Sequence, residues 1–421
     1  MKKLALVLLL LTMVSMEARG GGYQLNLFGI RQIGMAHIGT PYARDAANLA
    51  FNPGAAGFIP NSGIVGGSSF TFIDTGYLAP APSTYRENTE FGVNYPFNFH
   101  SVFRTDDLIP GNWGVGLSVY TPYGSSVVWP EGWKNQFFLQ EISLQSVYIQ
   151  PSIGYQFNDI IGVGAGLIYG YGAVNLQRNL PIADQDGNYA RVELDGDATA
   201  IGYNLGLMIR PVPEVTVGVG YRSQLDMEVE DGDAWFSVPS SIEGGFPPEN
   251  TFTASLPLPW VLSFGLSADL SEEITIAAQA DLTGWDAYEE LHLDFGENTE
   301  QLQDSREPRN YEDSWIFRLG GEYELSRQTQ LRAGVFYDMT PVQDGYMTPE
   351  TPDSDRISFT AGLTHQLTDN LGVNMSLMYL RSQEREQTEE HTVEAGTLGQ
   401  VPVGTFQTIA WIPGISVEYT F

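Results

Sequence analysis

The chain has 421 residues, with 20 basic and 51 acidic side chains and a formal net charge of −31. Such a negative surface repels nucleic acid, so no nucleic-acid partner is expected. The sequence contains no cysteine, which excludes disulfides, thiolate metal sites and thiol catalysis. The five histidines follow no metal-ligand spacing, and neither a metal site nor a cofactor is expected.

The first twenty residues have the pattern of a secretory signal peptide. Lys2 and Lys3 precede an apolar run over residues 4–14, and small residues follow near Gly20. The apolar run is too short to cross a membrane as a helix. We therefore expect residues 1–20 to be removed and the mature chain to begin near Gly21.

Residues 46–59 (AANLAFNPGAAGFI) form a compact apolar segment around a sharp turn. Pro53 fixes its own φ and keeps Asn52 out of the helical region, while Gly54 permits a reversal. Phe51 and Phe58 flank this turn among small residues. The whole segment 21–61 is too irregular and too rich in glycine to be a strand pair, so other parts of the chain must pack around it.

From residue 62 onward, apolar and polar residues alternate with a period of two, which predicts strands. In the segment 330–338, one face is apolar and carries Leu331, Ala333, Val335 and Tyr337. About fourteen such segments are expected, near 62–75, 89–104, 112–121, 141–157, 158–178, 193–211, 213–230, 251–268, 272–295, 310–325, 328–339, 354–367, 369–385 and 406–421.

The connections between these segments alternate between very short turns and long loops. The long loops lie near 122–140, 179–192, 231–250, 296–309, 340–353 and 386–405. An even number of strands with short turns at one rim and long loops at the other is typical of an outer-membrane barrel. The predicted fold is therefore all-β: a transmembrane antiparallel barrel of about 14 strands over residues 62–421. A lumen of this width needs filling, so we expect segment 21–61 to lie inside it as a hatch.

Six pieces of sequence, in chain order, carry a resemblance to a known family. They are 23–28 (YQLNLF), 45–58 (DAANLAFNPGAAGF), 113–129 (WGVGLSVYTPYGSSVVW), 256–270 (LPLPWVLSFGLSADL), 331–342 (LRAGVFYDMTPV) and 352–362 (PDSDRISFTAG). Together they resemble the FadL-type long-chain fatty-acid transporters of Gram-negative outer membranes, whose relatives include channels for toluene and similar hydrocarbons. The resemblance covers essentially the mature chain.

The resemblance implies a route that is not a water-filled pore. Ligand would be caught among the outer loops, move to an inner pocket and leave sideways through a gap at a kinked third strand. That strand corresponds to about residues 112–121, with Pro122 and Gly124 just beyond it. Asn52 and Pro53 match the hatch motif of the family, in which Gly54 replaces the usual alanine. We expect this turn to lie against the gap.

For a ligand carboxylate, the resemblance implies basic side chains at the inner pocket. One of these positions matches Arg178. A second falls on Glu307, which Arg306 and Arg309 flank, so that either arginine could take its place. The glutamate also leaves open a neutral hydrocarbon ligand, which needs no cation.

Four further arginines lie on the polar, inward phase of their strands, namely Arg222, Arg318, Arg332 and Arg356. They could attract a carboxylate ligand. A charge inside a barrel needs a partner, however, and the favoured interpretation is structural pairing with the lumenal acids Asp281, Glu322, Asp338 and Glu418.

The predicted function is passive uptake of long-chain fatty acids or similar hydrophobic compounds across the outer membrane of a Gram-negative-type bacterium. The alternatives are an aromatic-hydrocarbon channel and a non-transporting barrel that acts as a receptor or an enzyme. No Ser-His-acid grouping follows from spacing, so an enzyme is not expected. The other expected partners are outer-membrane lipid and lipopolysaccharide, and the expected state is a monomer.

Overall fold

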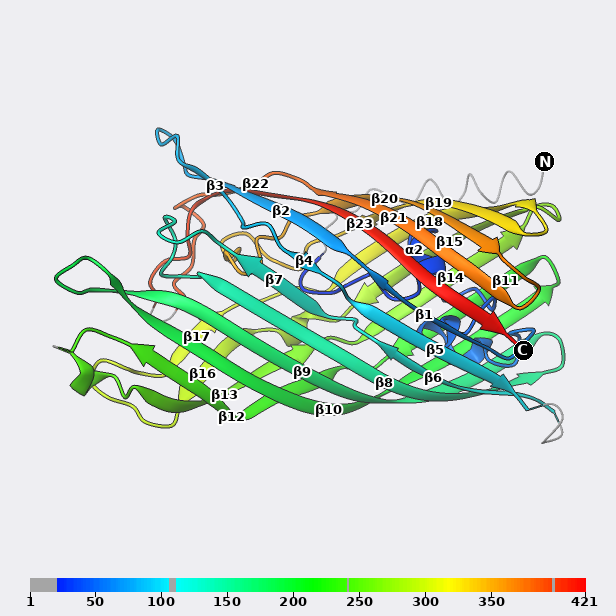
Figure 1. Ribbon diagram of the computed structural model, residues 1–421, viewed down its shortest axis with the longest axis horizontal. Coiled ribbons are helices and arrows are strands. Elements are labelled where there is room, and N and C mark those ends of the chain that lie inside the picture. The colour runs from blue at the N-terminus through cyan, green and yellow to red at the C-terminus, as the bar shows by residue number, and fades with distance from the viewer. Residues whose placement is uncertain (1–20, 106–110, 241, 396–397) are drawn as a thin grey trace.

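The computed structural model describes residues 21–105, 111–240, 242–395 and 398–421. The expected signal peptide, residues 1–20, lies outside these ranges. Figure 1 shows tilted strands running along the long axis, with the short helices of the N-terminal segment enclosed by strands near one end. Within the described ranges, no helix is both long and apolar enough to cross a membrane.

The fold is a closed antiparallel barrel of 14 strands, as predicted, and several of these strands are interrupted. In chain order they comprise β1 (Gly63–Ser69) with β2 (Thr71–Leu78); β3 (Arg86–Asn88), β4 (Val93–Asn94) and β5 (Phe97–Arg104); β6 (Asn112–Tyr120) with β7 (Gly124–Val128); β8 (Glu141–Phe157); β9 (Ile161–Ala183); β10 (Tyr189–Val212); β11 (Val215–Arg222) with β12 (Leu225–Ser237); β13 (Glu249–Leu258) with β14 (Val261–Asp269); β15 (Ile274–Thr283) with β16 (Glu290–Phe295); β17 (Ser305–Pro308) with β18 (Ser314–Ser326); β19 (Thr329–Asp338); β20 (Arg356–Gln366); β21 (Leu371–Ser382) with β22 (Arg385–Gln387); and β23 (Gly404–Thr420).

Pairing of the first and last strands closes the barrel. Gly63 of β1 lies opposite Thr420 of β23, and the register continues to Ser69 and Gly414. Closure pairs the edges of the first and last strands, which would otherwise stand unpaired in lipid. Outward-pointing side chains such as Leu319 and Ile201 are exposed and apolar, as a surface covered by lipid requires.

One of the predicted long outer loops is mostly a strand hairpin. The loop expected at residues 179–192 is shortened because β9 continues to Ala183 and β10 begins at Tyr189. These two strands have 23 and 24 residues, which exceeds the ~9–11 residues needed to cross a membrane. The outer part of the barrel therefore extends beyond the bilayer as a β-walled vestibule.

The N-terminal segment lies inside the barrel and is almost entirely buried. It contains α2 (Ile30–Ile33), α3 (Asn48–Phe51) and the 3-10 turn η1 (Pro53–Ala55). Two further 3-10 turns, η2 (Glu243–Gly245) and η3 (Trp285–Ala287), belong to the outer part of the barrel. A Cβ on Gly164 of β9 would overlap the Pro53 carbonyl oxygen. Glycine in these strands is therefore a packing requirement of the segment inside the barrel.

Candidate functional site

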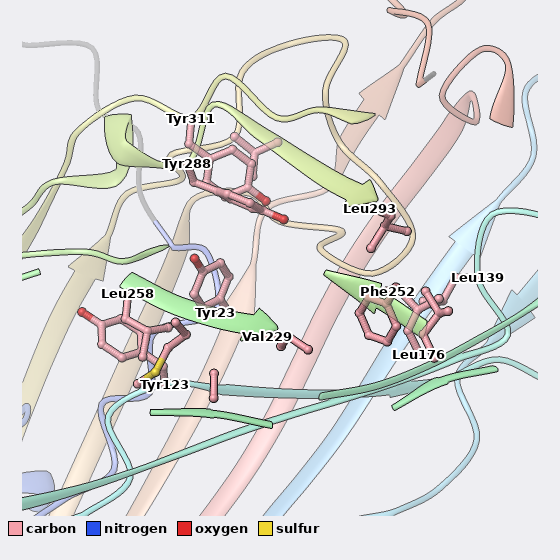
Figure 2. Close-up of a cluster of buried hydrophobic side chains, with 14 of the residues drawn as sticks. Tyr23, Tyr123, Leu139, Leu176, Val229, Phe252, Leu258, Tyr288, Leu293 and Tyr311 are labelled. Atoms are coloured by element: carbon pink, nitrogen blue, oxygen red, sulfur yellow. The ribbon is translucent and has the colours of Figure 1, made fainter. Parts of the chain in front are cut away.

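A cavity of about 1020 Å³, its open mouth included, lies in the outer half of the barrel. Its walls are apolar side chains from β9, β12, β13 and β16, among them Leu176, Val229, Phe252 and Leu293 (Figure 2). Ligand pockets of proteins are lined mainly by apolar groups, with a few polar side chains among them. The lining of this cavity suits a hydrophobic molecule.

Tyr23 and Tyr288 line the cavity. They belong to a cluster of contacting rings that we call the aromatic floor and define as Tyr23, Tyr123, Trp285, Tyr288 and Tyr311. The Tyr23 ring stands edge-on to Trp285 with 4.7 Å between centroids, and it lies 6.1 Å from the ring of Tyr123. Backbone carbonyls fix both tyrosines, because the Tyr23 hydroxyl donates to Pro257 O at 2.6 Å and that of Tyr123 to Pro259 O at 2.7 Å. Figure 2 shows Tyr23 between the Tyr288–Tyr311 pair and Tyr123.

A buried ionic network stands beside the cavity and joins four charged residues. Glu307 accepts hydrogen bonds from Arg178 through one oxygen and from Arg309 through the other, each at 3.0 Å. Arg309 also donates to Glu350 Oε1 at 2.6 Å. Two cations face two carboxylates, so the network has no net charge while both acids are ionised.

The pKa values of the two carboxylates of the network are shifted in opposite directions. Burial raises the pKa of Glu307, but the charges of Arg178 and Arg309 outweigh burial and hold this pKa below its ordinary value. Burial dominates at Glu350 and raises its pKa, although Arg309 opposes the shift. Glu307 is therefore the acid that anchors both arginines.

The three arginines predicted to bind ligand lie in different surroundings. Arg309 lines the cavity together with Glu350. Arg178 is not among the lining residues, and its guanidinium forms an ion pair with Glu307. Arg306 points away from the cavity, with its side chain 64% exposed and paired with Glu290. Their roles toward a ligand stay predictions.

The third barrel strand is interrupted where the sequence predicted a gap. β6 ends at Tyr120 and β7 begins at Gly124, with Pro122 between them. A proline cannot donate to a strand ladder, which explains the break. β7 then pairs with β8 along one edge. At its other edge, the described residues show one backbone hydrogen bond to the second strand, from Glu90 N to Val128 O at 2.7 Å.

The start of the mature chain occupies this interruption from the inside. Leu25 N donates to Pro122 O at 2.8 Å, and Gly124 N donates to Tyr23 O at 3.0 Å. Gln24 lies opposite Tyr123 in this short antiparallel bridge. Segment 23–25 therefore contributes Tyr23 to the aromatic floor and also covers the interruption.

The expected position of the Asn52–Gly54 turn was wrong. The turn packs on β9 and β10, where the Asn52 amide donates to Leu207 O at 3.0 Å and to Thr40 O at 2.9 Å. Its Oδ1 accepts the Gly54 amide at 2.9 Å. This turn packs so closely on the strands that glycines are needed beneath it: Gly164 of β9 faces the Pro53 carbonyl, and Gly206 of β10 faces Asn52 Oδ1 and the Gly54 nitrogen. It is segment 23–25 that lies against Pro122.

The two hatch phenylalanines have different surroundings. The Phe51 ring lies 4.6 Å from that of Phe28, within the buried aromatic cluster. The Phe58 ring lies under the guanidinium of Arg210, at 4.5 Å from its centroid. Both residues were predicted from their places beside the turn, whereas Tyr23 was missed as part of the floor. The signal was present in the YQLNLF piece, which begins with this tyrosine.

Structural pairing of the lumenal arginines is confirmed for three of the four. Each guanidinium Nε lies within 2.8 Å of a carboxylate oxygen in the pairs Arg318–Asp281, Arg332–Glu322 and Arg356–Asp338. Arg222 has a different neighbour and donates to the Tyr123 hydroxyl at 3.3 Å.

Comparisons with known proteins place the chain in a family. The sequence profile of outer membrane protein transport proteins (OMPP1/FadL/TodX) matches residues 11–421. The long-chain fatty acid transport protein of Escherichia coli O6:H1 is 22% identical over 455 residues, covering 97% of this chain and 96% of that protein. Outer membrane protein P1 of Haemophilus influenzae is 26% identical over 230 residues, covering 54% and 48%.

Solved structures show the same fold. The FadL homologue of Pseudomonas aeruginosa superimposes with a TM-score of 0.82 at 20% identity, covering 95% of this chain and 100% of that one. The toluene transporter TbuX of Ralstonia pickettii gives a TM-score of 0.71 at 16% identity, covering 94% and 99%. The match over nearly the whole sequence shows that the chain belongs to the family of outer membrane transport proteins that includes FadL and TodX.

Proposed function

We propose that this outer membrane transporter takes up long-chain fatty acids or similar hydrophobic compounds passively. The observation that carries the proposal is an apolar cavity beside a strand interruption, where one segment, 23–25, contributes to the aromatic floor and also covers the interruption. A ligand that displaces this segment can leave the cavity at its inner end and pass sideways through the interruption of the third strand. The relatives named as fatty acid transport proteins support the choice of ligand.

Capture relies on the hydrophobic effect. Burial of each CH₂ contributes about 0.8 kcal/mol, so a long acyl chain gains on the order of 10 kcal/mol before the cost of association. Release is downhill because the ligand passes from the cavity into the apolar interior of the membrane. No energy source is required by this scheme.

The exit proceeds sideways at the interruption of the third strand. Two backbone hydrogen bonds, one to Pro122 and one from Gly124, join segment 23–25 to the third strand, and side-chain bonds link Tyr23 to Pro257 and Gln24 to Thr283. Each such bond contributes about 1 kcal/mol net, so a ligand that replaces these contacts can displace the segment. The sparsely bonded edge of β7 then faces the second strand and the lipid.

A second candidate, an aromatic-hydrocarbon channel, is favoured by one specific observation. Arg178 and Arg309 are neutralised by Glu307 and Glu350, so the described residues of the cavity wall offer no free cation to a carboxylate. The transporters named for toluene share the fold. We further propose that the protein acts as a monomer without catalytic activity and that its acidic outer loops contact lipopolysaccharide through divalent cations.

Uptake of labelled oleate and labelled toluene separates these candidates. Cells lacking the gene are complemented with the wild-type chain or with Arg178→Ala, and the initial uptake of each compound is measured. Oleate uptake that depends on the gene supports the fatty-acid proposal. Toluene uptake without oleate uptake supports the hydrocarbon channel. If deletion affects neither compound, the protein is a receptor or has another non-transport role.

A further inference from the structure

One buried arginine of the barrel differs from the others. Among the described residues, five arginines are buried, and four of them lie within 3.0 Å of a carboxylate: Arg178, Arg309, Arg318 and Arg332. Arg222 is 8% exposed and has no carboxylate partner in that part of the chain. A buried charge without a counter-charge is costly, so its retention requires a reason.

Arg222 lies among tyrosines. Its guanidinium carbon lies 5.4 Å from the ring centroid of Tyr123 and 5.9 Å from that of Tyr148. One Nη2 hydrogen bond, to the Tyr123 hydroxyl, satisfies part of its donor capacity. The buried Nε of Arg222 and the buried hydroxyl of Tyr148 have no hydrogen-bond partner among the residues that the structure describes. Two polar groups with free hydrogen-bonding capacity thus stand in one aromatic enclosure.

The position of this enclosure links the cavity to the exit. Tyr123 belongs to the aromatic floor, and it is also the residue between Pro122 and Gly124 at the interruption of the third strand. Arg222 is the last residue of β11 and contacts Tyr123 directly. A ligand that passes the floor toward the interruption therefore comes within reach of Arg222.

We propose that Arg222, with the hydroxyl of Tyr148, is the binding site for the carboxylate of an acidic ligand as it moves from the cavity to the lateral exit. This proposal rests on the proposed function and names the ligand class as long-chain carboxylic acids. The cavity accepts an apolar chain whether its head group is charged or neutral, because the arginines beside the cavity are already paired with glutamates. Arg222 then discriminates, since an ionised carboxylate supplies the missing counter-charge and a neutral hydrocarbon does not.

The test compares an acid with its neutral analogue. Radiolabelled oleate and oleyl alcohol are bound at alkaline pH to the purified mature protein in lipid nanodiscs. The variants are Arg222→Met, Arg222→Lys and Tyr148→Phe. Arg191→Met serves as the matched control, because Arg191 is an exposed arginine of the outer hairpin. Heat-modifiable gel mobility verifies that each variant forms a folded barrel.

Arg222→Met should weaken oleate binding by about 10–100-fold, the range for a hydrogen bond to a charged group, and leave oleyl alcohol within twofold. Arg222→Lys should restore part of the loss, and Tyr148→Phe should weaken oleate alone by a few fold. Equal weakening of both ligands, or no change in oleate, overturns the proposal and makes Arg222 a structural or hydrated residue. If the wild-type protein binds neither ligand, the proposed function itself fails.

Discussion

Replacement of Glu307 with glutamine should convert the cavity wall from neutral to cationic. Glu307 is the acid that both Arg178 and Arg309 contact, each at 3.0 Å. Glutamine keeps the shape of the side chain and one acceptor oxygen but removes the charge. Glu350 then remains as the one carboxylate of the network opposite two guanidinium groups, and the site carries one positive charge.

The gain for an acidic ligand follows from the strength of a charge-assisted hydrogen bond, about 1.5–3 kcal/mol. At 1.4 kcal/mol per tenfold, oleate should bind roughly 10–100-fold more tightly to Glu307→Gln, while oleyl alcohol should bind unchanged. The same change should lower stability by about 3–5 kcal/mol, the cost of removing one partner from a buried ion pair.

Equilibrium binding of the two ligands to the purified protein measures this prediction. Glu290→Gln is the matched control, because Glu290 pairs with the exposed Arg306 and such surface pairs contribute only about 0–1 kcal/mol. The control should leave both affinities and stability nearly unchanged. If oleate binding does not tighten, or oleyl alcohol tightens equally, then charge neutralisation by Glu307 does not govern ligand choice.

Three further predictions concern the hatch and the ionic network. Pro53→Ala should leave barrel assembly intact on heat-modifiable gels, while uptake of labelled oleate falls, because the turn loses its fixed φ; uptake equal to wild type would contradict this. Gly164→Ala should lower the unfolding free energy by about 1–3 kcal/mol in urea titrations, since the new Cβ overlaps the Pro53 carbonyl, and an unchanged midpoint would contradict the packing. The pKa of Glu307 is lowered, so its stabilising contribution is complete above the ordinary carboxylate pKa of about 4.3 and is lost as the pH falls through its lower folded value. Limited proteolysis of the loop at 296–304 should therefore be unchanged from pH 7 to 5 and accelerate only in stronger acid, and acceleration between pH 7 and 5 would contradict this sign.

The strands could be predicted from sequence because the membrane imposes a strict rule. Where a strand crosses the bilayer, its outward positions face lipid and are apolar while its inward positions can be polar, so the period of two is visible there. Gln330–Asp338 was expected as a strand, and β19 runs from Thr329 to Asp338. Pro122 likewise marked the interruption of the third strand, because the loss of its amide is a local property.

The ionic network could not be derived in the same way, because it joins residues far apart in the chain. Arg178 and Glu307 are 129 positions apart, and only the closed barrel with its folded outer loops brings them together. In the sequence, Glu307 stands where the resemblance implies a basic residue. Its role as the shared partner of two arginines is evident only in the folded structure. Alternation predicts the face of the strand on which a side chain lies, but it does not predict which residue that side chain contacts.

The hatch shows the same limit. Sequence identified the Asn52–Gly54 turn as a distinctive element but placed it against the wrong part of the barrel. Its docking site is decided by the inner glycines of β9 and β10, which leave room for the close approach of the turn. The bridge between Gln24 and Tyr123 depends on two single backbone hydrogen bonds, which leave no pattern in the sequence.

The central claim is that segment 23–25 must leave the third-strand interruption for ligand to pass. Gln24 and Tyr123 form a non-hydrogen-bonded antiparallel pair, whose Cα atoms are typically about 4.5 Å apart, and a disulfide accepts roughly 4.4–6.8 Å. The natural chain has no cysteine, so Gln24→Cys with Tyr123→Cys introduces a single defined crosslink. Oleate uptake by cells carrying this double variant should be lost after oxidation and should recover after reduction. Equal uptake by the oxidised and reduced forms would contradict the claim.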